Sequence, residues 1–236
     1  MLNFLTAIIL LATTVYGGDP KVLQKREDAL KKEFMSKHLS WPVKQMYIRS
    51  FKYDSQLEVW VRNENNGPYQ LFKTYKICAL SGDLGPKRID GDYQVPEGFY
   101  YINEFKPNSD FHMALGLNYP NASDLLLSDS LNPGNGIFIH GSCVTTGCIP
   151  IKDEQIEELY ILAAAANKQG QDFIPVHIFP IRYNQAKGEA FLSRTRKEDL
   201  EYMGFSGRLK QVFDYFEEKK ALPVISVNKK GEYVIL

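Results

Sequence analysis

Apolar and polar residues alternate along much of the first 180 residues, which is typical of β-strands. Two runs of β-branched and aromatic residues between positions 46 and 62 flank Asp54 and Ser55, which favour a turn, and together they predict a hairpin. The same kind of pattern predicts further strands at 69–79, 98–102, 111–118, 136–139 and 175–180, and a terminal hairpin within 223–236.

Helical spacing replaces this alternation in three places. Apolar residues recur three and four positions apart in 20–38, in 153–168 and across 185–220. Asp153 can cap the second of these helices, and Gly170 can close it. The patterns therefore predict a mainly β core with added helices, an α+β fold.

The clearest alternation lies at residues 111–118. One face would carry Phe111, Met113, Leu115 and Leu117, which we expect in the core. The other would carry the small and polar residues His112, Ala114, Gly116 and Asn118. Such a face either lines a cleft or is a half-exposed sheet surface.

Candidate chemistry is concentrated in residues 136–151. A short buried strand delivers His140 at its end, and a turn rich in small and hydroxyl residues leads to Cys148. A thiol is a useful nucleophile only as its thiolate, and a nearby imidazole can take the thiol proton. Backbone N–H groups at Thr146, Gly147 and Cys148 could hold the oxyanion of a tetrahedral intermediate.

The chain of 236 residues, with 44% apolar and 24% charged residues, has ordinary globular composition and can bury one main core. Its net charge is zero and no basic block stands out, so nucleic acid is not an expected partner. An apolar run at positions 4–15 is too short for a membrane span and suits a secretory signal, although no Lys or Arg precedes it. An uncleaved anchor or a buried helix is the alternative.

These observations predict four segments: a signal peptide at 1–18, a helical segment at 19–45, a catalytic domain at 46–182, and helices with a hairpin at 183–236 packed on the same domain. We expect an exported protein of the periplasm or cell envelope, with no stable membrane span after signal cleavage. With three cysteines, at least one thiol stays unpaired, and in a catalytic interpretation this is Cys148. A bond between Cys143 and Cys148 would block the nucleophile.

Two other functions compete with catalysis. His140, Cys143 and Cys148 could instead hold a metal in a structural or binding domain, although zinc signatures use closer repeated spacings and a fourth ligand. The chain could also be a catalytically inactive wall-binding module. We favour the thiol chemistry, with no metal and no cofactor.

The His-Gly step, the short loop and the Gly-Cys-Ile step before a helix resemble the Cys/His motif of the murein L,D-transpeptidases, the YkuD-type catalytic domain, and most closely its YafK-like branch. Stretches at 77–87, 95–100, 117–122 and 176–180 are similar to that branch in the same order, so the resemblance covers the chain from about residue 46 onward. Pro150 departs from the pattern, since many members of the wider family have Arg there.

The resemblance implies a β-sandwich-like fold and action on peptidoglycan stem peptides or on protein linked to the wall. It implies that Cys148 is the nucleophile, that His140 is the proton donor and acceptor, and that the Gly141 carbonyl orients His140. It also makes His112, Asn118, Thr146 and Lys87 candidate substrate contacts, although ordinary surface charge is the simpler explanation of Lys87. Transfer to an amine and hydrolysis by water remain open, since both share one acyl-enzyme.

Overall fold

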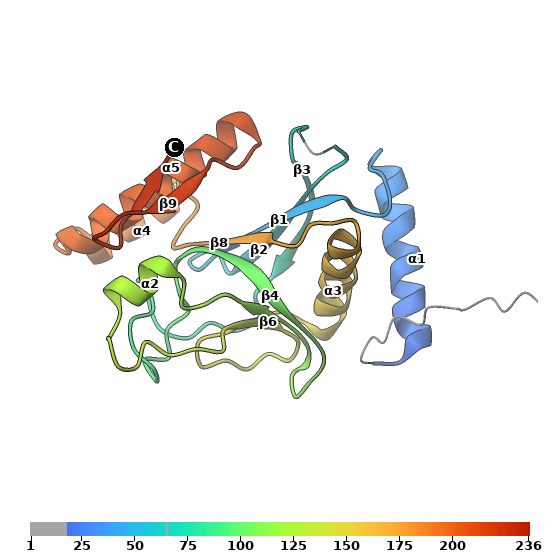
Figure 1. Ribbon diagram of the computed structural model, residues 1–236, viewed down its shortest axis with the longest axis horizontal. Helices are drawn as coiled ribbons and strands as arrows, with labels where there is room; N and C mark the ends of the chain where they lie inside the picture. Colours follow the sequence, from blue (N-terminus) through green and yellow to red (C-terminus); the bar gives the residue numbers. More distant parts are fainter. Residues whose placement is uncertain (1–17, 65) are drawn as a thin grey trace, which may run out of the picture.

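The computed structural model describes residues 18–64 and 66–236, and an eight-stranded sheet forms its centre (Figure 1). The strand order is β3-β2-β1-β8-β4-β5-β6-β7. The strands are β1 (Gln45–Phe51), β2 (Gln56–Arg62), β3 (Gln70–Lys76), β4 (Gly98–Ser109), β5 (His112–Leu117), β6 (Phe138–His140), β7 (Ile149–Pro150) and β8 (Ile174–Phe179). The predicted mainly β fold with added helices is confirmed.

Five helices lie around this sheet in the described part of the chain, and a small hairpin adds a second sheet. They are α1 (Pro20–Ser36), α2 (Ala122–Leu127), α3 (Asp153–Lys168), α4 (Ala186–Arg196) and α5 (Leu200–Lys219), with β9 (Ile225–Val227) and β10 (Tyr233–Ile235). The helix predicted at 153–168 is confirmed, but Lys152 rather than Asp153 is its N-cap residue. Helix α2 was not predicted, because its six residues are too few to display a helical period.

The sheet curls until its two ends meet. Ile77, just after β3, forms an antiparallel bridge with Ile151, just after β7. The Cys78 N–H donates to the Pro150 carbonyl at 3.0 Å beside this bridge. The last strand before the α3 helix is therefore fixed at both edges, by β6 on one side and by the end of β3 on the other.

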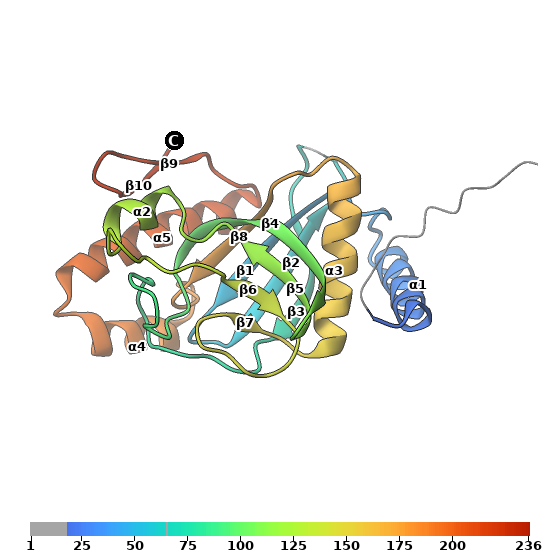
Figure 2. The ribbon, with the colours of Figure 1, turned by 60° about the horizontal axis from the view of Figure 1, so that its bottom comes forward.

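Apolar side chains are buried on both faces of the central strands. On one face Ile48 and Ile139 belong to a cluster that includes residues of α3 and α1, and on the other Phe51 packs with Phe179 of β8 and Phe213 of α5. Helices α3 and α1 lie on one side of the sheet, and α4 and α5 lie on the other (Figure 2). Cover on both sides explains why every residue of β1 after Gln45 is buried, whether apolar or polar. The large core makes the strands that carry the candidate site a rigid support.

A buried ion-pair network attaches α5 to this sheet. Arg49 of β1 contacts Glu58 of β2 and Glu217 of α5, each at 2.7 Å, although only 2% of its side chain is exposed. Arg182 adds a second guanidinium to Glu58 at 2.5 Å. Since a buried charge is tolerated only when paired, removing any of these partners should weaken the attachment of α5.

His177 is a hydrogen-bonded imidazole in the core. It is buried in β8, and its Nδ1 lies 2.8 Å from the Tyr47 hydroxyl. Burial, reinforced by the Arg49 charge, lowers the pKa of His177 to about 3.

We predict that His177→Gln makes the protein less acid-sensitive. The folded pKa lies below the unfolded value of about 6.5, so His177 contributes stability above pH 6.5 that is lost as pH falls toward 3, about 3 kcal/mol of it by pH 4. Urea unfolding of both proteins at several pH values measures this. A wild-type advantage that stays constant from pH 7 to pH 4 would contradict the prediction.

The predicted signal peptide at 1–18 lies, except for its last residue, outside the described residues. Across residues 18–64 and 66–236, no helix is both long and apolar enough to cross a membrane.

Candidate active site

His140 ends β6, and Cys148 directly precedes β7, the strand that pairs with β6 in parallel. β6 pairs with β7 through Ile139 opposite Ile149 and His140 opposite Pro150. Both isoleucines are fully buried in the core. Because successive side chains of a strand alternate between faces, His140 and the residue before Ile149, Cys148, both point away from that core.

The His140 imidazole is held on two sides. Its Nδ1 lies 2.5 Å from the Gly141 carbonyl oxygen, so Nδ1 carries the proton and Nε2 is left with its lone pair. The Phe111 ring packs against it with centroids 4.7 Å apart. The side chain is almost fully buried, and this burial lowers the pKa of His140 while the Gly141 carbonyl partly opposes the effect.

Cys148 is half-buried and its sulfur faces the backbone of β6. Sγ is 3.6 Å from the Gly136 carbonyl oxygen, to which the thiol donates. Burial raises the pKa of Cys148, while the Phe138 N–H and the Lys87 charge oppose the increase. Burial therefore favours the uncharged form of both the thiol and the imidazole, and the hydrogen bonds of the thiol run to the backbone.

We predict that iodoacetamide alkylates Cys148 with an apparent pKa above that of an ordinary cysteine, because burial disfavours the thiolate in the resting protein. Cys148 is the free cysteine of the chain, so the intact mass reports its alkylation directly. The rate should keep rising from pH 7 to pH 9. An inflection near or below pH 7 would instead indicate a resting thiolate-imidazolium pair.

Polar contacts hold the loop between His140 and Cys148. The Thr145 hydroxyl donates to the Cys148 carbonyl at 2.8 Å and accepts from the Gly147 N–H at 3.1 Å. Gly147 has φ +141°, which strongly favours glycine, and a Cβ there would make a tight contact of 3.2 Å with the Gln94 carbonyl oxygen. The predicted oxyanion donor of Gly147 is therefore paired with Thr145 in this state.

The same loop is anchored to the start of α3. Asp153 does not cap the helix as predicted, because its carboxylate accepts instead from the Ser142 N–H at 2.7 Å. A Cβ at Gly141 would lie 2.7 Å from that carboxylate and 2.9 Å from the Phe111 carbonyl oxygen. Glycine is thus the residue that fits at 141, beside the histidine.

A disulfide between Cys78 and Cys143 ties the loop to the end of β3, with Cα atoms 5.4 Å apart. This pairing leaves Cys148 as the free thiol and gives Cys143 a partner other than Cys148. The competing metal hypothesis required Cys143 as a thiolate ligand, which a disulfide sulfur cannot supply. The predicted ligand set is therefore incomplete.

Replacing both Cys78 and Cys143 by serine should destabilise the protein by about 2–4 kcal/mol, since the bond closes a loop across 65 positions. Urea unfolding of the double variant, compared with wild type with and without reductant, measures the loss. The double variant should behave like the reduced wild type. Equal stability of all three samples would show that the bond contributes nothing.

Lys87 is not placed to receive a substrate carboxylate as predicted. Its Nζ forms an ion pair with Asp92 at 2.5 Å and donates to the Ile89 carbonyl at 2.8 Å, and the residue is buried. Sequence position indicated a surface loop, but the segment folds inward here and satisfies the charge. The Lys87 charge still influences the site, because it opposes the increase in the pKa of Cys148.

His112 and Asn118 also have partners within the fold. His112 has φ +73°, which interrupts the alternation of β5 and turns its Nε2 to Glu157 of α3 at 2.9 Å. The Asn118 side chain accepts from the Tyr101 N–H at 2.8 Å, between β4 and β5. Thr146, the remaining predicted contact, is exposed on the loop.

Phe111 was assigned to the core by alternation, but 44% of it is exposed. The break at His112 moves Phe111 off the core face and places its ring against His140. The roles of Phe111, Thr145 and the Phe138 N–H were missed, because each depends on how distant strands and turns meet. The pairing of β5 with β6 sets Ala114 opposite His140, and this register brings Phe111 close to the imidazole.

Comparison with known families agrees with this geometry. The L,D-transpeptidase catalytic domain model, YkuD, matches residues 49–178, which is more than half of the chain and runs from within β1 to within β8. The chain belongs to the L,D-transpeptidase family.

Among individual relatives, the chain is 34% identical over 206 residues to the YafK protein of Escherichia coli strain K12, whose own assignment as an L,D-transpeptidase is provisional. The match covers 86% of this chain and 78% of that protein.

Two solved structures are more distant. The helical cell shape determining protein Pgp2 of Campylobacter jejuni is 18% identical with a TM-score of 0.45, covering 87% of this chain and 81% of Pgp2. Bd1075 of Bdellovibrio bacteriovorus is 21% identical with a TM-score of 0.42, covering 80% and 79%.

Proposed function

We propose that the protein is an exported cysteine acyltransferase that acts on the stem peptides of peptidoglycan. The observation that carries the proposal is the pair of strands that presents His140 and Cys148 on one face, with Nδ1 of the imidazole held by Gly141. Membership in the L,D-transpeptidase family supports the same substrate class.

In the first half of the reaction, Nε2 of His140 takes the thiol proton as Sγ of Cys148 attacks the carbonyl carbon of a diaminopimelate residue. The carbonyl π electrons move to oxygen, and the Gly147 N–H leaves Thr145 to bind that oxyanion. The tetrahedral intermediate then collapses. Its C–N bond breaks, the departing amine takes the proton from His140, and a thioester remains on Cys148.

In the second half, an acceptor amine or a water molecule attacks the thioester carbonyl and gives its proton to His140. The C–S bond breaks, and the Cys148 sulfur recovers a proton from the imidazolium. An amine yields a crosslink or an attached protein, and water yields hydrolysis. Hydrolytic release of a protein or peptide linked to diaminopimelate is the second candidate, favoured by the half-exposed Cys148 and the exposed Thr146, which leave the loop open to water.

Chromatography with mass spectrometry of reaction products tests the proposal and separates the two outcomes. Purified muropeptides with a tetrapeptide stem are incubated with the enzyme, with and without a second stem as acceptor, and in parallel with protein-linked muropeptides. Crosslinked dimers support transpeptidation, and released amine without dimers supports hydrolysis. Unchanged substrates with the wild type would contradict both and favour a non-catalytic wall-binding module.

A further inference from the structure

The sheet register places a charged pair beside the candidate nucleophile. Glu104 and Lys106 of β4 pair with Gly116 and Ala114 of β5, which in turn pair with Phe138 and His140 of β6. Directly opposite residues of antiparallel strands share a face. Both charged side chains therefore project from the face that carries His140 and Cys148.

Contacts on the other face of the sheet confirm that Glu104 and Lys106 point away from the core. Phe105, which lies between the two charged residues, packs against Tyr160 of α3 with ring centroids 5.6 Å apart. Its partner Leu115 is fully buried in the core. Glu104 and Lys106 thus lie outside the core, with 47% and 43% of their side chains exposed.

Phe138 connects this pair to the nucleophile. Its backbone N–H favours the thiolate form of Cys148, and Lys106 Nζ lies over its ring, 4.3 Å from the ring centroid. The ring can lie there because position 116 is glycine, where a Cβ would be 3.1 Å from the Phe138 Cε1 atom. Glu104 lies 3.3 Å from Lys106 Nζ and leaves the ammonium partly open to solvent.

We propose that Lys106 and Glu104 form a specificity subsite for the amino-acid end of the diaminopimelate side chain, where one carbon carries a carboxylate and an ammonium. The inference rests on the proposed function and names residues that recognise part of its substrate. Lys106 binds the carboxylate, and Glu104 binds the ammonium. A neighbouring cation and anion match a zwitterionic group better than either charge alone.

The dimensions agree with this assignment. β4 and β7 are three strand spacings apart, so their backbones are separated by about 14 Å. The extended carbon chain of diaminopimelate spans about 7 Å between its terminal carboxyl carbons. Nucleophilic attack at one end and a hydrogen bond at the other add about 3 Å each.

Binding to a Cys148→Ala background tests the subsite independently of catalysis. The probes are two tetrapeptide-stem muropeptides that differ at one residue, diaminopimelate or lysine, so that only the side-chain carboxylate is removed. We expect the diaminopimelate probe to bind about tenfold more tightly by calorimetry. Adding Lys106→Ala should abolish this preference. Adding Glu104→Gln should instead lower the binding affinity of both probes, because both carry the ammonium.

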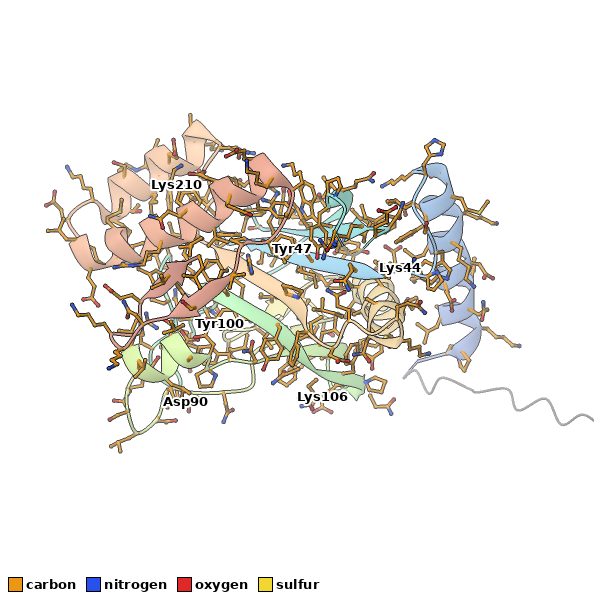
Figure 3. All side chains as sticks on the ribbon, turned by 45° about the horizontal axis from the view of Figure 1, so that its top comes forward. Lys44, Tyr47, Asp90, Tyr100, Lys106 and Lys210 are labelled. Atoms are coloured by element: carbon orange, nitrogen blue, oxygen red, sulfur yellow. A yellow bond between two sulfur atoms is a disulfide. The ribbon has the colours of Figure 1, made fainter. Side chains whose placement is uncertain are left out.

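Lys210→Ala is the matched control, because Lys210 is an exposed lysine in an ion pair with Asp214 on α5, far from Lys106 (Figure 3). It should keep the full preference. A preference that survives Lys106→Ala, or the absence of binding of either probe, would overturn the subsite. Thioester formation by wild-type protein is measured separately, so the subsite can fail while the proposed function stands.

Discussion

Cys148→Ala should lower the rate of acyl transfer at least about 10³-fold, because the variant has no group that can form the thioester. The side chain is half-buried, and its sulfur contacts the backbone at Gly136 and Phe138. We therefore expect the unfolding free energy to change by less than about 1 kcal/mol. Product formation from muropeptides, followed beside thermal unfolding, separates the two quantities.

Lys210→Ala serves as a control for handling and folding in this comparison, since it alters an exposed ion pair on α5. It should retain wild-type turnover. If Cys148→Ala kept more than a tenth of wild-type turnover, the nucleophile would have to lie elsewhere in the chain.

The second large effect is expected for His140→Gln, which should lower turnover by about 10²–10⁴-fold. Glutamine can keep a polar contact near the Gly141 carbonyl but cannot take the thiol proton. Because His140 is almost fully buried, the variant should also lose some stability, so turnover must be measured well below its unfolding temperature.

Alkylation distinguishes loss of the base from loss of the fold. At pH 9 and above, iodoacetamide should modify Cys148 in His140→Gln at nearly the wild-type rate, because burial, not His140, sets the thiol pKa in the resting state. Turnover within threefold of wild type would show that His140 is not the base.

Much of the fold could be predicted from the sequence because local patterns determine it. The β1–β2 hairpin and the α3 helix follow directly from alternation and helical spacing. The curling of the sheet could not, since the bridge between Ile77 and Ile151 joins residues 74 positions apart in the sequence. No local pattern reports which strand edges meet.

In the candidate site, too, some features follow from the local sequence and others depend on the fold. His140, Gly141, Gly147 and Cys148 stand close together in the sequence, and their neighbourhood was predicted from it. The partners of Lys87, His112 and Asn118 could not be predicted, because they come from other elements or from the folded path of a loop. The charged pair on β4 emerges only once the register of four strands is known.

The central claim is that Cys148 forms a thioester with a stem peptide, and intact-protein mass spectrometry tests it most directly. Wild-type protein and Cys148→Ala are incubated with a purified disaccharide-tetrapeptide, quenched in acid, and mapped by proteolysis. We predict a wild-type adduct equal in mass to the donor minus its departing amine, located on the peptide that contains residue 148 and absent from the variant. Identical masses for both proteins, or an adduct on another residue, would contradict the account.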